Sequence, residues 1–404
     1  MNVEYREPRA EELGRLIHTG LLGFGNSTAQ QEIDRRLGYE GWYRPDEHLA
    51  AFADGEVAAK LAVRPFAIAW HGREIACGGL TGVATSPAHR RRGHLRELLR
   101  RAFLRQRERG QPLSMLWASM AAIYQRFGYV CQQPTFDARR LAFVDDVATP
   151  GRVRLVPRDE VLQTVAPAYE RFAGPRSLML RRSEFWWMDG LLRQWNPGDA
   201  PELVAAYEKA GEVRGYLLYK VEQDAAVRAN NLKLEVRDLV WHTPAAHRAL
   251  LQYLAAYDRA HTVTFNALPQ DDPLFFGVQE PRDLNTRAVD GTWLRIVDLP
   301  AALEGRGYGG DGRLRFAVED ELCPWNSGVW ELAVEGGVAR VRRCQREPEI
   351  QLTPRALAML ACGSASASLL ARLGLLRGTT EPHTLATADA LFRNDYAPYC
   401  MDHF

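Results

Sequence analysis

The clearest alternation of strand-like and helix-like hydrophobic patterns lies between residues 79 and 129. Residues 80–85 are a β-capable run that ends at Ser86 and Pro87, and Gly93 stands where a helix would begin. Apolar residues then recur at helical spacing, at Leu95, Leu98, Leu99, Ala102 and Phe103. A second β-capable run covers residues 113–119. This pattern predicts a strand, a turn, a helix that packs one face on a sheet, and a second strand.

The flanking residues predict the rest of an N-terminal domain. The expected elements are a short strand and a helix over 9–24, strands at 49–53 and 57–68, and a hairpin turn at 70–73. A strand pair that follows Tyr129 and ends near Val144 is expected to complete a mixed sheet. Pro150 and Gly151 then mark a linker, which is the first expected domain boundary.

The last third of the sequence, from Trp293 to Phe404, begins with alternating apolar and polar positions. Strands are expected at 313–320, 329–337 and 338–344, with a hairpin at Gly336 and Gly337. Two helical segments follow, at 354–361 and 365–373. The order of these elements predicts a separate domain of mixed helix and strand.

The turn before the helix at residue 93 has the composition of an anion site. Its backbone N–H groups and the positive end of the helix dipole would point at a pyrophosphate. Arg90, Arg91 and Arg92 add positive charge next to Gly93. Strand, turn and helix together therefore predict a site for a phosphate-bearing cofactor.

Residues 153–287 look like a faint copy of the first domain. Residues 240–248 read V-W-H-T-P-A-A-H-R before a helical run, as residues 85–90 of the first copy read T-S-P-A-H-R. The second turn has no glycine and keeps only Arg248 where the first has three arginines. Such a turn is poorly suited to a pyrophosphate, so we expect one cofactor per chain.

Length and composition indicate a globular protein of several domains. Its 404 residues exceed what one hydrophobic core usually organises, and 46% apolar with 25% charged residues is an ordinary globular composition. The net charge of +1 argues against nucleic-acid binding, although arginine greatly outnumbers lysine. No apolar run is long enough to cross a membrane and the N-terminus lacks a signal-peptide layout, so we expect no membrane partner and a cytoplasmic location.

The six cysteines are scattered along the chain, without C-x-x-C pairs or nearby histidines at metal spacing. They are Cys77, Cys131, Cys323, Cys344, Cys362 and Cys400. We therefore expect reduced thiols and no metal site.

The turn also carries a family motif. Residues 90–95 follow the pattern Arg or Gln, two residues, Gly, one residue, then Gly or Ala, except that Leu95 replaces the small residue. These residues resemble the cofactor motif of the GNAT N-acetyltransferase superfamily. With A-S at 118–119, I-Y-Q-R-F-G-Y at 123–129, the segment 290–308 and the final phenylalanine, the chain resembles the Eis (enhanced intracellular survival) family, which acetylates several amines of aminoglycosides.

The resemblance implies an α+β fold of two tandem GNAT domains with mixed sheets, followed by a sterol-carrier-like domain. The expected boundaries are 1–148, 149–289 and 290–404, with acetyl-CoA bound by the first domain alone. The resemblance also implies a homo-oligomer, which is a hexamer in the family. Because a fold does not fix a function, we expect the last domain to be a scaffold rather than a lipid site.

Amide formation needs a base for the substrate ammonium and an acid for the departing sulfur. The resemblance assigns the acid to Tyr124 and the base to the α-carboxylate of Phe404. Backbone N–H groups of residues 83–85 would hold the pantetheine and polarise the thioester carbonyl. The expected cofactor-binding residues are Val83, Ala84, Thr85, Arg91, Arg92, Gly93, His94, Leu95, Arg96 and Ser119.

Three further details qualify this site. Met120 stands where the family pattern has a glutamate, which would make the amine pocket less acidic. His89 and His94 are expected to face solvent or the anion and to take no part in catalysis. The helix continues a basic face at Arg96, Arg100, Arg101 and Arg105, whose first members would reach the 3′-phosphate of the cofactor.

The expected substrate is a cationic, aminoglycoside-like small molecule that receives its acetyl group directly in a ternary complex. Carboxylates and aromatic walls would bind it, and the candidates are Phe24, Trp42, Tyr43, Asp395 and Asp402. Two alternatives remain open at this point: a protein lysine Nε-acetyltransferase, and a non-catalytic module that binds acetyl-CoA or a lipid.

Overall fold

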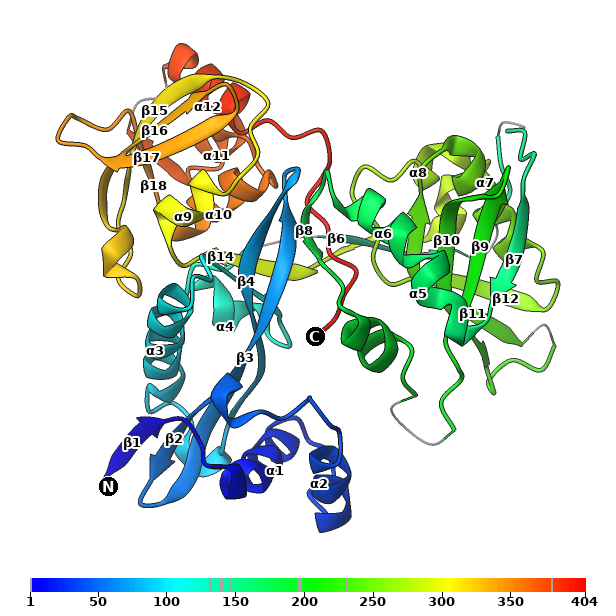
Figure 1. Cartoon of the computed structure of the whole chain (residues 1–404), viewed down its shortest axis with the longest axis horizontal. Helices are drawn as coiled ribbons and strands as arrows, with labels where there is room; N and C mark the ends of the chain where they lie inside the picture. The colour runs from blue at the N-terminus through cyan, green and yellow to red at the C-terminus, as the bar shows by residue number, and fades with distance from the viewer. Residues whose placement is uncertain are drawn as a thin grey trace.

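The computed structural model describes residues 2–130, 133–138, 141–144, 147–194, 198–229, 231–378 and 381–404. Figure 1 shows three lobes: an N-terminal lobe in blue and cyan, a second lobe in green and a C-terminal lobe in yellow and orange. A C-terminal tail, in red, runs back from the third lobe and ends between the other two. Mixed sheets with helices in all three lobes confirm the predicted α+β class.

The first sheet belongs to the N-terminal lobe and has seven strands. Its order is β1 (Val3–Arg6), β2 (His48–Ala53), β3 (Glu56–Trp70), β4 (Arg73–Thr85), β5 (Leu113–Trp117) and β14 (Thr292–Ile296), while β8 (Ser177–Leu180) pairs with β3. The predicted strands and hairpin are confirmed, and His71 and Gly72 form the turn with φ of 52° and 84°. β4 and β5 run parallel, as a helical crossover between them requires.

Helices cover both faces of this sheet. α3 (His94–Glu108) packs its predicted apolar stripe on Ala59, Leu61 and Val63 of β3. On the opposite face lie α1 (Leu13–Gly23) and α2 (Gln30–Leu37), and short helical turns occur at Ala10–Glu12 and Pro45–Glu47. Because side chains alternate along a strand, Lys60, Arg64 and Phe66 of β3 point to the α1 side.

The second sheet also has seven strands. Its order is β13 (Arg287–Val289), β6 (Gln133–Ala138), β12 (Ala260–Phe265), β11 (Leu232–Trp241), β10 (Glu212–Gln223), β9 (Leu203–Lys209) and β7 (Arg152–Val156). Its helical elements are Arg158–Glu160, α5 (Val161–Thr164), α6 (Ala166–Ala173), a π-helical turn at Trp186–Leu191, α7 (Pro244–Ala255), α8 (Leu274–Gly277) and Pro281–Leu284.

The expectation that a strand pair after Tyr129 completes the first sheet is wrong. β6 pairs with β12 and β13 in the second sheet. The physical reason is that β14 already occupies the edge of β5, with Thr292 opposite Trp117 and Ile296 opposite Leu113. Strands β6, β8 and β14 therefore tie the first two lobes together across the expected boundaries.

The C-terminal lobe has a five-stranded sheet. Its order is β17 (Val338–Arg343), β16 (Gly328–Glu335), β15 (Gly312–Val318), β18 (Ile350–Leu352) and β19 (Leu376–Gly378), with a helical turn at Pro324–Asn326. Its helices are α9 (Leu299–Glu304), α10 (Pro354–Cys362), α11 (Ala367–Arg372) and α12 (Pro382–Leu391). The predicted strands and the two predicted helices are confirmed.

The tip of the β3–β4 hairpin fastens this lobe to the first sheet. Trp70 Nε1 donates to the carbonyl of Ala302 at 2.9 Å, and His71 Nε2 lies 3.0 Å from the carbonyl of Ala361. A Cβ at Gly307 would stand 1.8 Å from the carbonyl oxygen of His71, so only glycine fits there.

Within the described ranges, no helix is long and apolar enough to cross a membrane. Across the same residues, no group of three or more His, Cys, Asp or Glu side chains could hold a metal ion. Among the described residues, cysteines 77, 323, 344, 362 and 400 form no disulfide bond, and Cys131 lies outside these residues.

Candidate active site

The two central strands of the first sheet separate along the second half of β4. β4 pairs with β5 from Cys77 to Gly79, and the ladder ends there. On its other side β4 remains paired with β3, apart from a bulge at which Gly82 takes a φ of 57°. The edge of β4 beyond Gly79, which includes residues 83–85, therefore presents backbone groups toward β5 without a strand partner.

The turn after β4 leaves the N-terminus of α3 open. A helical turn at Pro87–His89 leads to Arg91 and Gly93, whose φ values are 61° and 82°. Among the residues that the structure describes, no side chain caps α3, and a Cβ at Gly93 would meet no atom within 4 Å. Arg91 and Arg92 are exposed beside it. Free N–H groups, positive charge and open space are what an anionic phosphate requires.

The corresponding helix of the second lobe differs in this respect. Thr243 caps α7, because its Oγ1 accepts a hydrogen bond from the N–H of Ala246 at 3.1 Å. His247 is paired with Asp272 at 3.2 Å, and Arg248 lies over the ring of Phe143. The groups that would meet a phosphate are thus already engaged, which supports the expectation of one cofactor per chain.

Isothermal titration of the full chain with coenzyme A is expected to give one site per chain. Gly93→Val should weaken that binding by about tenfold or more, since a β-branched residue is strained at a positive φ. Ala245→Val, in the first turn of α7, is the matched control and should leave the affinity unchanged. Two molecules bound per chain would contradict the prediction.

Two expected cofactor residues have other partners. His94 is buried, and its Nδ1 lies 2.9 Å from the hydroxyl of Tyr5, so the expectation that its side chain faces solvent or an anion is wrong. Burial lowers the pKa of His94, which keeps the ring neutral. Arg96 pairs with Glu321 of the C-terminal lobe instead of standing free on the helix face. Both partners are distant in sequence, and no local pattern points to them.

Tyr124 lies on α4 (Ala121–Gln125), just after β5. Its side chain is 5% exposed, and burial raises its pKa to about 12. Among the described residues its hydroxyl has no hydrogen-bond partner, while its ring meets Tyr129 edge-on at 6.0 Å. The phenol therefore keeps its proton and has an unused donor.

The C-terminal tail reaches the place where β4 leaves β5. Thr81 Oγ1 donates a hydrogen bond to a backbone oxygen of Phe404 at 3.2 Å, and the ring of Phe404 lies 4.9 Å from that of Phe66. His403 packs on Trp117 with ring centroids 4.8 Å apart. A Cβ at Gly79 would collide with Phe66 and lie 3.0 Å from the ring of Phe404, so glycine makes room for the tail.

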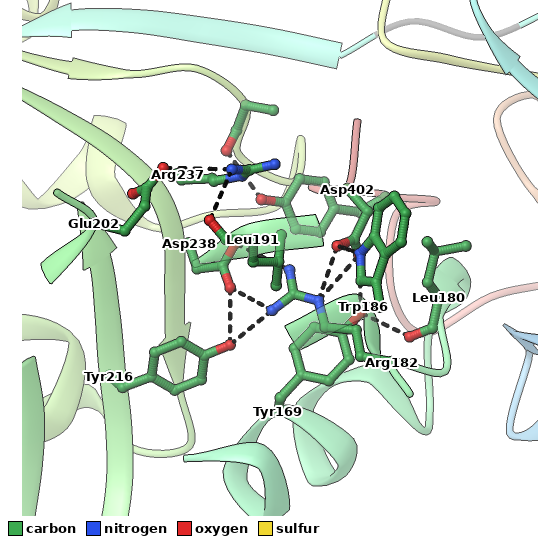
Figure 2. Close-up of polar contacts among 12 residues, drawn as sticks. Tyr169, Leu180, Arg182, Trp186, Leu191, Glu202, Tyr216, Arg237, Asp238 and Asp402 are labelled. Atoms are coloured by element: carbon green, nitrogen blue, oxygen red, sulfur yellow. Dashed lines mark hydrogen bonds and ion pairs between the residues drawn. The ribbon is translucent and has the colours of Figure 1, made fainter. Parts of the chain in front are cut away.

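A buried ion network holds this tail, and Figure 2 shows it in detail. Asp402 is 0% exposed and accepts hydrogen bonds from Arg182 Nε at 2.9 Å and Trp186 Nε1 at 2.7 Å. Arg182 also pairs with Asp238 at 2.5 Å, and Asp238 accepts a hydrogen bond from Tyr216 at 2.9 Å. The expectation that Asp402 forms a wall for the substrate is therefore wrong, because its carboxylate is buried and paired with Arg182.

The chain is similar to known acetyltransferases over most of its length. Models of acetyltransferase (GNAT) domains match residues 4–131 and 178–296, and a sterol carrier protein domain model matches residues 299–401. An uncharacterised N-acetyltransferase of Streptomyces avermitilis is 32% identical over 82% of this chain and 83% of its own length. N-acetyltransferase Eis of Mycobacterium tuberculosis is 33% identical over 78% of each chain. The chain belongs to the Eis-like family of GNAT N-acetyltransferases.

Eis1 of Mycobacterium abscessus gives the structural counterpart, with a TM-score of 0.81 and 27% identity over 100% of both chains. The two GNAT domains and the sterol-carrier-like domain predicted from the sequence are confirmed. Like other GNAT proteins, members of the Eis-like family are acetyltransferases, and such enzymes use acetyl-CoA.

Leu95 and Met120 are the two positions that depart from the sequence pattern of the family. Leu95 is half-buried against the core under α3, so a larger residue is accommodated where the motif has a small one. Ser119 and Met120 are exposed after β5, and Met120 offers no charge there.

A cavity of about 520 Å³ borders the tail of this Eis-like protein on the α1 side of β3. Phe66, whose ring packs on Phe404, is part of its lining. The other lining residues are Gly41, Arg44, Glu47, Arg64, Pro65, Ala67, Leu180, Arg181, Ser183, Phe185 and Trp186. Because Phe66 connects this cavity to Phe404, it is the candidate amine-binding cavity.

Only some of the aromatic and acidic residues expected to bind the substrate lie at this cavity. Trp42 packs beside the cavity, with its ring 5.5 Å from Phe185. Tyr43 stacks on His48 instead. Phe24 and Asp395 are exposed and are not among the residues that line this cavity.

Proposed function

We propose that the chain transfers the acetyl group of acetyl-CoA directly to a primary amine in a ternary complex. The observation that carries the proposal is the hydrogen bond between Thr81 and Phe404 where β4 separates from β5. A carboxylate at this position lies next to the edge of β4, whose backbone N–H and C=O groups are not paired with β5 beyond Gly79. It is suited to take a proton from an incoming ammonium.

The residues at the turn fit the phosphates of acetyl-CoA. The uncapped N-terminus of α3 and the open space at Gly93 would accept the diphosphate, with Arg91 and Arg92 as counter-charges. When bound, acetyl-CoA supplies an activated acetyl thioester. Backbone N–H groups of residues 83–85 would orient it and favour negative charge on its carbonyl oxygen.

Tyr124 is proposed as the proton donor to the sulfur. With a pKa of about 12, the phenol is fully protonated at neutral pH. Among the described residues no group accepts a hydrogen bond from its hydroxyl, so the proton is available for the departing sulfur. Phe404 as base and Tyr124 as acid would thus act on the two sides of one transfer.

Tyr124→Phe is expected to lower kcat by about 10²-fold, because one positioned acid is lost, while the dissociation constant of coenzyme A stays within about twofold. Steady-state kinetics and isothermal titration measure the two quantities. Tyr129→Phe is the matched control, since it removes a neighbouring buried hydroxyl that bonds Ser114 at 2.7 Å. An unchanged kcat in Tyr124→Phe would remove the tyrosine from its role.

Release of free thiol from acetyl-CoA, measured against a panel of amines, tests the function itself. Intersecting initial-velocity lines support direct transfer, whereas parallel lines or a trapped acetyl-enzyme contradict it. Turnover of lysine peptides alone would favour a protein lysine acetyltransferase. Absence of turnover with every amine would favour a binding module.

The resemblance predicts an aminoglycoside-like polycation as the amine, and a hexamer as the assembly. Both remain predictions. Including aminoglycosides in the amine panel of the thiol-release assay tests the first of them. The charges around the cavity favour a different kind of amine.

A further inference from the structure

Lys60 is a buried lysine on the α1 side of β3, next to the bulge of β4. Its side chain is 6% exposed, and a Cβ at Gly82 would stand 2.9 Å from Nζ. A Cβ at Gly20 of α1 would stand 3.2 Å from the same atom. Two glycines therefore make room for this ammonium between α1 and the strand edge next to Thr81.

In the part of the chain that the structure describes, no acidic group is paired with Lys60. Among the described residues it forms no hydrogen bond and no ion pair. The charged groups that act on it are Arg36 of α2 and Arg64 of β3, and both carry the same sign. His48 of β2 is also near, and burial together with Lys60, Arg64 and Arg105 lowers its pKa to about 3, so its ring is neutral. Burial and the two arginines lower the pKa of Lys60 to about 8.

The cavity that Arg64 lines also carries more positive than negative side chains. Arg44, Arg64 and Arg181 line it, against one carboxylate, Glu47. Arg44 pairs with Asp46, and Arg181 pairs with Glu170 at 2.6 Å and Glu74 at 3.3 Å, outside the lining.

Arg64 is the least compensated of the three arginines. Its Nη1 is 3.9 Å from Glu47, a distance too long for a hydrogen bond, and its Nη2 donates to the carbonyl of Trp42 at 2.8 Å. Burial raises the pKa of Glu47. Lys60 and Arg64 thus form a cationic pair on the side of β3 that leads to Phe404.

A polycationic amine would bring further positive charge to two buried cations, which is unfavourable at low dielectric. An amine that also carries an acid would supply the missing counter-charge. We propose that the amine substrate carries an anionic group, a carboxylate or a phosphate, which binds between Lys60 and Arg64 while its amine reaches Phe404. This inference rests on the proposed acetyltransfer at the same site, and it names the class of amine.

A matched series of primary amines tests the inference with the full-length protein. 6-Aminohexanoate, hexylamine and 1,6-diaminohexane share one chain length and differ only in the far group, which is anionic, neutral or cationic. We expect kcat/KM for 6-aminohexanoate to exceed that for hexylamine by about tenfold or more, as a charge-assisted hydrogen bond provides, and the diamine to be the poorest of the three. 6-Aminohexyl phosphate distinguishes a phosphate preference from a carboxylate preference.

Substitutions of Lys60 and Arg64 test whether these residues cause the preference for the anionic amine. Lys60→Met and Arg64→Gln should each reduce the ratio of kcat/KM for 6-aminohexanoate over hexylamine by about tenfold, because each removes one of the two cations. Lys209→Met, an exposed lysine on β9, is the control and should leave the ratio unchanged. Thermal melting confirms folding, and Arg64→Gln serves alone if Lys60→Met does not fold.

The possible results distinguish a failure of this inference from a failure of the proposed acetyltransferase function. Equal turnover of the three amines, or preference for the diamine or an aminoglycoside, overturns the inference but leaves acetyltransfer standing. No thiol release with any amine overturns the proposed function first. A preference for the acid that survives both substitutions would also overturn the role of Lys60 and Arg64.

Discussion

Two residues added after Phe404 are expected to lower kcat by about 10²-fold or more, because the α-carboxylate that the proposal uses as base becomes an amide. The hydrogen bond from Thr81 fixes this end of the chain at the separated edge of β4. An extension also has to find space beside Phe66, which already touches the ring of Phe404. Steady-state thiol release with a saturating amine measures the loss.

Phe404→Leu is the matched control for the carboxylate. It keeps the terminal acid and removes the aromatic contact, so we expect a loss of kcat well below that of the extension. A tag at the N-terminus should have no effect, since β1 lies at the far edge of the sheet. Full activity of the extended protein would show that the carboxylate is dispensable.

Asp402→Ala should be the most damaging single change to stability. It leaves the guanidinium of Arg182 and the indole N–H of Trp186 without their shared acceptor in a fully buried place. Breaking a buried ion pair on one side costs about 3–5 kcal/mol, although Asp238 retains part of the charge balance. Urea unfolding followed by fluorescence measures the shift in midpoint.

The same variant should lose turnover, because the tail that carries Phe404 is no longer anchored between the lobes. Asp395→Ala is the control: this carboxylate lies on the same tail but is exposed. Asp402→Asn, which keeps the size and one acceptor, should fall between the two. A wild-type midpoint for Asp402→Ala would show that the network contributes little.

Local elements could be predicted well from the sequence. The strand that ends at Thr85, the helix that begins after Gly93 and the hairpin at residues 70–73 depend on turn residues and on apolar spacing within a few positions. The absence of glycine near Arg248 likewise indicated a poor phosphate turn, and the cap by Thr243 agrees with it.

Features that depend on distant partners could not be predicted. The sequence predicts Asp402 at a substrate wall, and its burial could not be foreseen because its partner Arg182 stands 220 positions earlier in the chain. His94 was expected at the surface for the same reason, as Tyr5 is 89 positions away. The short strands β6 and β14 have patterns that fit either sheet, and only the competition for the edge of β5 decides where each one pairs.

The exchange of strands also bears on how the chain is assembled on the ribosome. Met115 of β5 pairs with Leu294 of β14, so the N-terminal sheet gains its last strand only after nearly three quarters of the polypeptide has been synthesised. Until then β5 presents an unpaired edge, the kind of surface at which nascent chains associate wrongly. A fragment cut before β14 would retain that edge permanently, so the first lobe and the beginning of the third form one folding unit.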